Sequence, residues 1–346
     1  MNVLIRFCAT VVAALVGAGC GSNQEDFQTV PPHLIESMKT HCAGRFLIDL
    51  PASFRLTHSG TVGVGDATFY FGHGTDFSTV DVSVVADRIT PGIFEAGVAQ
   101  RMEELTRATN HATDGPMLVG SETWGDTGIR LLRYASSVIS DAKVHELHLL
   151  VGEAHVAMST TAFQESQARD ADARLQAMAT RVAPVGDPQN APPGTCLGPV
   201  VVDAGSDYEE LELAFRATDA VHADIRFRIS LNTLPQADDE PSLIARGESN
   251  LTGLGVKWKT LNKGARQLAG MRGEQWLGAF DDKGAPQHGF YAETDLRTGA
   301  PGQPRLMLEM FTGGERESGE PVAASLSDGQ AASLWTSILD SLRFRR

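Results

Sequence analysis

The stretch Cys42-Ala-Gly-Arg-Phe-Leu-Ile-Asp49-Leu-Pro51 determines how we divide the chain, because its outline returns at Cys196-Leu-Gly-Pro-Val-Val-Val-Asp203. Both copies follow the pattern Cys-x-Gly-x-x-x-x-Asp, with an apolar run between the glycine and the aspartate. A short apolar run bounded by glycine, proline and aspartate predicts a strand. Since each copy also heads a similar series of expected elements, the sequence predicts a duplicated domain.

The two copies give the same order of expected elements: three strands, a helix, four strands and a closing helix. For the first copy we expect a short leading helix over 33–41, strands over 45–50, 67–72 and 79–86, a helix from Thr90-Pro91 to about 109, four strands between 117 and 161, and a helix over 165–181. For the second copy we expect strands over 198–203, 210–217 and 223–231, a helix over 242–251, four strands between 265 and 311, and a last helix capped by Ser327.

This order predicts an α+β fold of two similar domains, each an antiparallel sheet packed with helices on one face. The predicted boundaries are a signal peptide at 1–19, a tether at 20–32, an N-terminal domain at 33–184, a linker at 185–194 and a C-terminal domain at 195–346. Prolines and glycines are concentrated in the linker, and they are typical of a connection between folded units.

The N-terminus has the features of a secretion signal. Arg6 precedes an apolar run over 7–18, which is too short to span a bilayer as a helix. The run ends in small residues directly before Cys20, as in a bacterial lipoprotein signal in which this cysteine is lipidated. The alternative is simple secretion with cleavage after a small residue. We expect a periplasmic protein tethered to the membrane through Cys20, with the outer membrane favoured because Gly21 is not the aspartate of inner-membrane retention.

Two cysteines remain once Cys8 is removed with the signal and Cys20 carries the lipid. Cys42 and Cys196 occupy equivalent places in the two copies, and an even pair in an oxidising compartment is a candidate disulfide. The pairing requires their Cα atoms to lie within about 7 Å of each other. The alternative is two buried thiols, each packed as a small apolar residue.

Composition and motifs exclude several functions. The net charge of −14, without a basic cluster, argues against nucleic acid as a partner. The sequence has no Gly-x-Ser-x-Gly elbow, Walker loop or His-Glu-x-x-His pair, so we expect no catalytic residue, cofactor or metal site. His145 and His148 lie three apart in an expected strand, where their rings point to opposite faces. His73, Asp238-Asp-Glu240 and Asp281-Asp282 are interpreted as loop residues, because the acidic runs lack the spacing of a calcium loop.

The signal ending in Cys20, the Cys42–Pro51 segment, the Cys196-x-Gly start of the second copy and the closing helix 334–344 together resemble one family. It is the lipoprotein immunity proteins that neutralise phospholipase effectors of the bacterial type VI secretion system, the Tli group with paired N- and C-terminal domains. The resemblance covers the whole mature chain. It implies a non-catalytic protein, similar to a two-lobed claw, that grips a lipase and blocks its lid or its substrate entry. Contact residues vary with the partner, so the partner-binding residues stay unknown at this point.

Two other classes remain open at the level of sequence. A non-catalytic envelope lipoprotein with a scaffold or assembly role would have much the same sequence. An enzyme would require a pocket in which polar groups converge around a residue of shifted pKa.

Overall fold

The structure is a computed structural model, and it describes residues 30–57, 66–74, 77–124, 129–138, 140, 142–235, 240–254, 257–295, 300, 303–316 and 318–345. The predicted signal peptide 1–19 and the predicted lipidation site Cys20 lie outside these residues. The last residues of the predicted tether belong to the folded part, since Val30 is only 4% exposed and Pro32 begins a helix.

Within the described part of the first half, eleven strands precede the closing helix, and most are short. Its elements are α1 (Pro32–Ile35), β1 (Met38–Gly44), β2 (Phe46–Pro51), β3 (Phe54–Thr57), β4 (Ala67–Phe71), β5 (Ser78–Ala86), α2 (Pro91–Arg107), β6 (Thr109–Asn110), β7 (Gly115–Pro116), β8 (Leu118–Trp124), β9 (Ile129–Ala135), β10 (Lys143–Val151), β11 (Ala154–Ala162), η3 (Glu165–Gln167) and α3 (Ala168–Ala179).

The second half repeats the main elements after a short strand and turn. Its elements are β12 (Val182–Pro184), η4 (Pro188–Asn190), β13 (Thr195–Leu197), β14 (Val200–Val202), β15 (Tyr208–Ala217), β16 (Arg226–Asn232), α4 (Leu243–Leu254), β17 (Lys259–Leu268), β18 (Met271–Asp282), β19 (Ala285–Thr294), β20 (Arg305–Thr312), β21 (Gly314–Glu315), β22 (Pro321–Val322), α5 (Asp328–Ser341) and β23 (Arg343–Phe344).

The expected helix over His33–His41 is wrong over most of its length. Only Pro32–Ile35 is helical, and Met38–Gly44 forms strand β1. The repeated Cys-x-Gly pattern therefore forms a hairpin in each half: β1 with β2, and β13 with β14. Gly44 and Gly198 turn these hairpins with φ of 56° and 79°, which only glycine adopts readily. A Cβ on Gly44 would lie 2.9 Å from the Leu231 side chain, so packing requires glycine as well.

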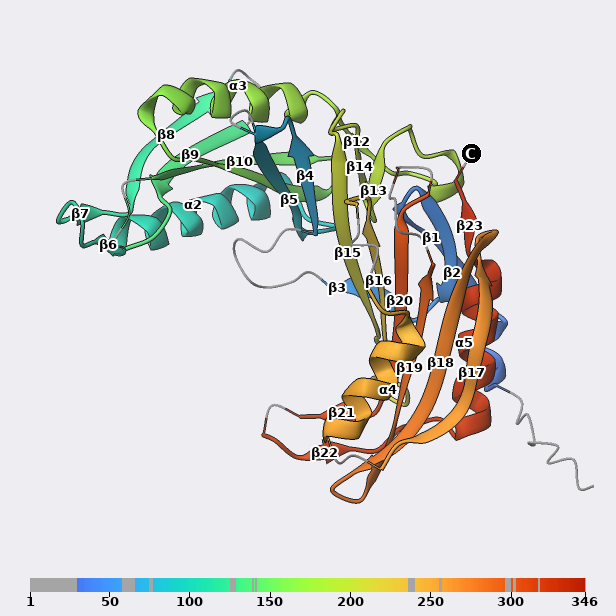
Figure 1. Ribbon diagram of the computed structural model, residues 1–346. Helices are drawn as coiled ribbons and strands as arrows, with labels where there is room; N and C mark the ends of the chain where they lie inside the picture. Colours follow the sequence, from blue (N-terminus) through green and yellow to red (C-terminus); the bar gives the residue numbers. More distant parts are fainter. Residues whose placement is uncertain are drawn as a thin grey trace, which may run out of the picture.

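The strand order of the large sheet is symmetric about its middle. Twelve of its 13 described strands follow one path, whose middle is the pairing of β4 from the first half with β15 from the second, and β3 also pairs with β15. Outward from this junction the first half follows the order β4-β5-β11-β10-β9-β8, and the second half follows the matching order β15-β16-β20-β19-β18-β17. All these pairings are antiparallel, and Figure 1 shows the two halves as lobes set at an angle. Each half therefore runs strands, helix, strands, helix, but more than the expected three strands precede α2 and α4.

In the smaller sheet, each half contributes a strand that pairs with the hairpin of the other half. Its order is β12-β14-β13-β1-β2-β23, so the hairpins of both halves lie side by side in its centre. β12 follows the closing helix of the first half but pairs with β14 of the second half. β23 follows the closing helix of the second half but pairs with β2 of the first half. Each half thus completes the hairpin of the other.

Helices cover both faces of the large sheet, which corrects the expectation that they lie on one face. His145 contacts Asp172 of α3, and the next residue, Glu146, contacts Arg101 of α2. Since successive strand residues point to opposite faces, α2 and α3 lie on opposite sides of β10. Figure 1 shows the corresponding arrangement in the second half, where α4 and α5 lie on opposite sides of the sheet.

One hydrophobic cluster runs through both halves. It contains Phe46 and Val82 from the first half, with Leu213, Phe290 and Trp335 from the second. The fold is α+β with large antiparallel sheets and few helices, while the division into separate domains at residues 184–195 stays a prediction. Among the described helices, none combines the length and the apolar character needed to cross a membrane.

Candidate protein-binding face

One face of the large sheet extends without a break from α2 to α4. In the second half, the cross-strand partners Arg228, Glu309, Tyr291 and Trp276 follow one another across β16, β20, β19 and β18. Directly opposed residues in an antiparallel sheet point to the same side. Trp276 lies under α4, because a Cβ on Gly247 of α4 would approach its ring to 2.4 Å. We call this side the concave face (Figure 1).

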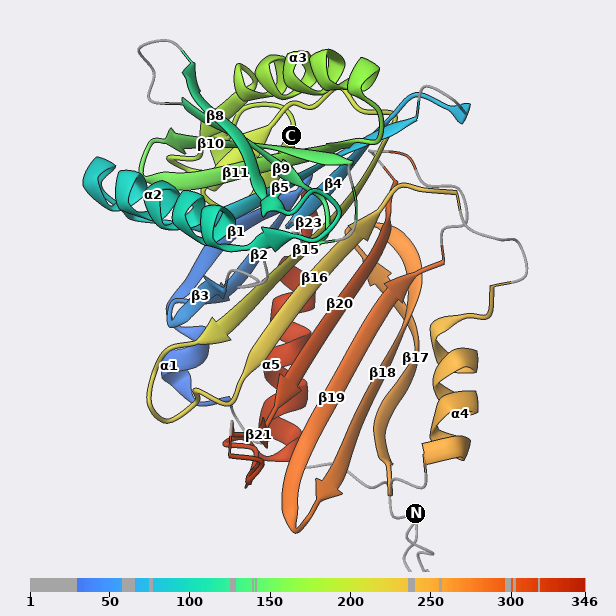
Figure 2. The ribbon, with the colours of Figure 1, turned by 90° about the vertical axis from the view of Figure 1, so that its left-hand side faces the viewer.

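The same face continues into the first half. Glu210 of β15 lies opposite Thr68 of β4, which lies opposite Asp81 of β5. Asp81 lies opposite Ser159 of β11, and Ser159 lies opposite Glu146 of β10. Glu146 lies beneath α2, so both helices stand on the concave face, one near each end. The strands between them are seen from this side in Figure 2.

A buried polar cluster attaches α2 to the sheet. Arg101 of α2 donates two hydrogen bonds to Glu146, at 3.0 and 3.2 Å. Tyr134 donates to the same carboxylate at 2.7 Å, and His148 Nε2 lies 2.8 Å from it. Burial alone would raise the pKa of Glu146, but the hydrogen bonds from His148 and Arg101 outweigh it and lower the pKa to about 2. Glu146 therefore stays ionised and holds the helix in place.

The cluster ends at His155 of β11. Its Nε2 lies 2.9 Å from His148 Nδ1, and its ring packs edge-on against Phe94 of α2. Burial, with a smaller effect from His148, lowers the pKa of His155 to about 4. His155 is therefore neutral at physiological pH. His145 lies on the other face, with Nδ1 2.6 Å from Asp172 of α3. The prediction that His145 and His148 point to opposite faces is confirmed.

The uncovered floor of the concave face in the second half is rich in arginine and aromatic side chains. Arg228, 45% exposed, lies 3.4 Å from Glu212 and 3.2 Å from Glu309. Tyr291 packs edge-on against Phe311 with ring centroids 5.7 Å apart. Arginine and aromatic residues are enriched in protein interfaces and among the side chains that dominate binding energy. The composition of this floor is therefore typical of a protein-binding surface.

Trp258 lies on the same floor, directly before β17, which begins at Lys259. Its ring covers the opposed glycines Gly278 and Gly289, and a Cβ on Gly278 would overlap it at 1.9 Å. The ring stacks on Phe280 with centroids 5.9 Å apart. Sequence reasoning missed this contact, because two glycines in apolar strands gave no sign that an aromatic ring lies over them.

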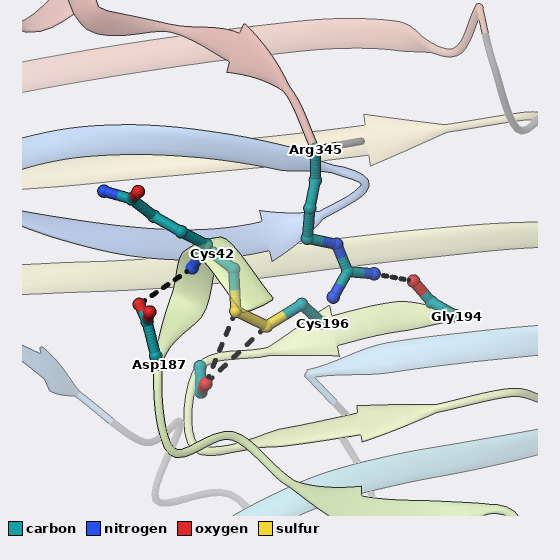
Figure 3. The surroundings of a disulfide bond; sticks show 7 residues. Cys42, Asp187, Gly194, Cys196 and Arg345 are labelled. Atoms are coloured by element: carbon teal, nitrogen blue, oxygen red, sulfur yellow. Dashed lines mark hydrogen bonds between the residues drawn. A yellow bond between two sulfur atoms is a disulfide. The ribbon is translucent and has the colours of Figure 1, made fainter. Parts of the chain in front are cut away.

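The small sheet supports the junction from the opposite, convex side. It carries a disulfide between Cys42 of β1 and Cys196 of β13, with Cα atoms 5.8 Å apart (Figure 3). This separation meets the distance condition for the proposed pairing. The carbonyl of Gly198 lies 3.6 Å from both sulfur atoms. Nearby, Arg345 donates to the carbonyl of Gly194, and Figure 3 shows this contact beside the disulfide.

A cavity of about 400 Å³ lies beside this sheet, and its lining includes His41, Cys42 and Arg55. Burial, followed by the charges of Lys39 and Arg55, lowers the pKa of His41 to about 4. The cavity contains a titratable group of shifted pKa, but its one cysteine, Cys42, is part of the disulfide.

The other residues singled out from sequence lie apart from one another. His73 is exposed in the turn between β4 and β5, and Asp281 accepts a hydrogen bond from Gly284 N in the β18–β19 turn. Asp238 and Asp239 lie outside the described residues. Within the described ranges no group of three or more His, Cys, Asp or Glu side chains could hold a metal ion.

These features define the class. The large antiparallel sheet has an open face whose arginine and aromatic side chains are typical of protein-binding surfaces. Residues 189–346 match the family described as the Tle cognate immunity protein 4 C-terminal domain. The C-terminal part of the chain is therefore similar to a family of immunity proteins, which are non-catalytic inhibitors, and the resemblance to type VI secretion immunity proteins is confirmed.

Solved structures share the fold over nearly the whole chain. The crystal structure of the Tle4–Tli4 complex contains a chain that is 22% identical, with a TM-score of 0.61, covering 90% of this chain and 98% of that one. The apo structure of the immunity protein TplEi of the type VI secretion system of Pseudomonas aeruginosa is also 22% identical, with a TM-score of 0.61 and coverage of 89% and 97%. No curated protein matches the sequence.

Proposed function

We propose that the chain is a periplasmic immunity protein that binds a cognate type VI secretion phospholipase effector and inhibits it. The match of residues 189–346 to the immunity domain carries this proposal. The similar chain in the Tle4–Tli4 complex supports it, since that structure contains an immunity protein together with its partner.

The concave face is the part of the molecule that we assign to the effector. α2 and α4 stand on it as two raised sides, with the arginine and aromatic floor between them. A protein seated there would contact both halves at once, which favours slow dissociation. Contact on two sides of a lipase would block movement of its lid or access of lipid to its active site.

Lipidation at Cys20 would place this face where a phospholipase works. A short polar tether would then hold the folded part, which begins at Val30, close to the periplasmic side of the membrane, and we favour the outer membrane. Metabolic labelling with radioactive palmitate should mark the wild-type chain and not the Cys20→Ala variant. Labelling of neither chain would indicate simple secretion.

The function is tested with the lipase encoded beside the gene. Cells that direct this lipase to the periplasm should survive only when the full chain is co-expressed, and the purified chain should inhibit phospholipid hydrolysis at a 1:1 ratio. Survival without a physical complex would contradict direct inhibition. Absence of both would favour the scaffold role.

A further inference from the structure

Three arginines lie directly opposite one another across neighbouring strands at the centre of the large sheet. Arg55 of β3 is paired with Arg216 of β15, and Arg216 is paired with Arg226 of β16. Arg226 lies two residues before Arg228 on the same strand, so the register places Arg216 and Arg226 on the concave face, while Arg55 at the end of the row also lines the cavity beside the small sheet. Arg216 and Arg226 are exposed, and Arg55 is half-buried. We call these three residues the arginine row.

The arginine row has no carboxylate partner within the part of the chain that the structure describes. Arg55 donates to the carbonyls of Ala52 and Phe54, at 2.5 and 2.9 Å. Arg216 Nε donates to a carbonyl at 3.1 Å, that of Ala223. Arg226 donates to a carbonyl at 3.2 Å, that of Gly313. These contacts satisfy some N–H groups but leave the three positive charges uncompensated.

This arrangement is unfavourable for the isolated fold. Like charges directly opposed in a sheet are destabilising, and a protein of net charge −14 has many carboxylates that could have been placed beside them. The adjacent Arg228 shows the usual solution, because Glu212 and Glu309 both lie within 3.4 Å of it. Asp224, two residues before β16 begins, instead accepts hydrogen bonds from the backbone N–H groups of Gly313 and Ser325.

We propose that the arginine row is a carboxylate-binding strip that receives an acidic segment of the effector. Guanidinium groups bind carboxylates through two parallel hydrogen bonds, and neighbouring arginines on adjacent strands can bind successive acidic residues of one segment. The charge complementarity argues for an acidic protein partner, and the position on the concave floor puts the strip between α2 and α4. This inference rests on the proposed function and adds the chemistry of the partner surface.

The test uses the full chain, the neighbouring-gene lipase and charge-reversal variants. The double variant Arg216→Glu/Arg226→Glu should weaken binding of the lipase by about 100-fold, because like charges at an interface are strongly repulsive. Arg169→Glu on α3, an exposed arginine on the convex side, is the matched control and should bind like the wild type. Raising the salt concentration should weaken the wild type more than the double variant.

A second variant separates binding from folding. Arg216→Thr/Arg226→Thr places residues suited to strands at both positions, and it should reduce affinity while leaving the urea midpoint unchanged or higher. A lower midpoint with unchanged affinity would assign the row a structural role and overturn the proposal. If both double variants bind the lipase as tightly as the wild type, the proposal for the arginine row is also overturned, while the proposed function stays intact. Failure of the wild type to bind the lipase would instead contradict the proposed function.

A further experiment tests whether the arginine row binds an anionic lipid instead of the effector. Vesicles of phosphatidylglycerol should bind the wild type and the charge-reversal variant equally. If only the wild type binds vesicles, and both bind the lipase, the strip contacts lipid and the proposal is wrong.

Discussion

At the scale of single residues, the buried histidine His155 links stability to pH. Its pKa is about 4 in the folded protein and about 6.5 when exposed. Between these values the unfolded chain binds a proton that the folded chain does not, so stability falls as pH falls from 6.5 to 4. Glu146 acts at lower pH. Because folding lowers the pKa of Glu146, its ionised carboxylate stabilises the fold at pH values above its pKa in the unfolded chain. This stabilisation is lost as the pH falls toward 2.

We expect His155→Gln to flatten the pH dependence between 6.5 and 4 by as much as about 3 kcal/mol of unfolding free energy. Glutamine keeps a hydrogen-bonding group near His148 but does not titrate. Urea unfolding at several pH values measures the slope. The exposed His73→Gln is the control and should keep the wild-type slope; an unchanged slope in His155→Gln would show that His155 binds protons equally in the folded and the unfolded chain.

The cysteine pair is the second residue-scale case. Cys42 and Cys196 are separated by 154 positions, so their disulfide constrains a long loop in the unfolded chain. Cys42→Ser/Cys196→Ser should lower the unfolding free energy by about 3–5 kcal/mol. Dithiothreitol should lower the urea midpoint of the wild type but not that of the double variant. Equal midpoints for oxidised and reduced wild type would favour the alternative of two buried thiols.

At the scale of elements, the start of α5 is fixed by a capping box. Ser327 accepts from Gln330 N at 3.3 Å, and the Gln330 side chain accepts from Ser327 N at 3.1 Å. The helix presents Leu334, Trp335 and Ile338 to the core, so its start also positions the largest buried side chain. The sequence predicted this cap correctly, because capping depends on residues only three positions apart.

Ser327→Ala should reduce the unfolding free energy by about 1 kcal/mol. The substitution removes one acceptor at the helix start and leaves the buried face of α5 unchanged. Ser337→Ala is the control, since Ser337 is exposed within the same helix and bonds only to the carbonyl of Ser333. Urea unfolding of the two variants should therefore differ, and equal midpoints would show that the cap contributes nothing.

At the scale of the whole molecule, the two halves depend on each other. The large sheet crosses from one half to the other at β4 and β15, and the small sheet exchanges β12 and β23. Arg343 of β23 also lies 3.2 Å from Asp49 of β2. Separating the halves would expose the open edges of both sheets and the shared apolar cluster. The spacing between α2 and α4 is consequently a property of the complete chain.

We therefore expect residues 30–187 and 188–346, produced separately, to be aggregated or without cooperative unfolding. Produced together, they should form a soluble 1:1 complex, because each half supplies strands that the other lacks. Size-exclusion chromatography and far-ultraviolet circular dichroism distinguish these states. A half that unfolds cooperatively by itself would establish the division into independent domains that the sequence predicted.

Local patterns in the sequence were enough to predict several strands and helix starts. Alternating apolar residues gave the hairpin of β4 and β5, the Thr90 cap and Pro91 gave the start of α2, and the repeated Cys-x-Gly pattern gave the duplication. The strand expected over 223–231 corresponds to β16, which contains Arg226 and Arg228. Each of these signals needs only residues within a few positions of one another, or a comparison of two segments.

The pairing of strands across the halves could be known only from the folded structure. The opposed positions of Arg55, Arg216 and Arg226 depend on the registers of three strands. The strands that carry Arg55 and Arg216 lie about 160 residues apart in the sequence. Likewise, β12 and β23 leave their own halves because their backbone groups find open edges on the other half's hairpin. Long-range pairing is selected by the total burial and hydrogen bonding of the folded chain, and no local pattern specifies it.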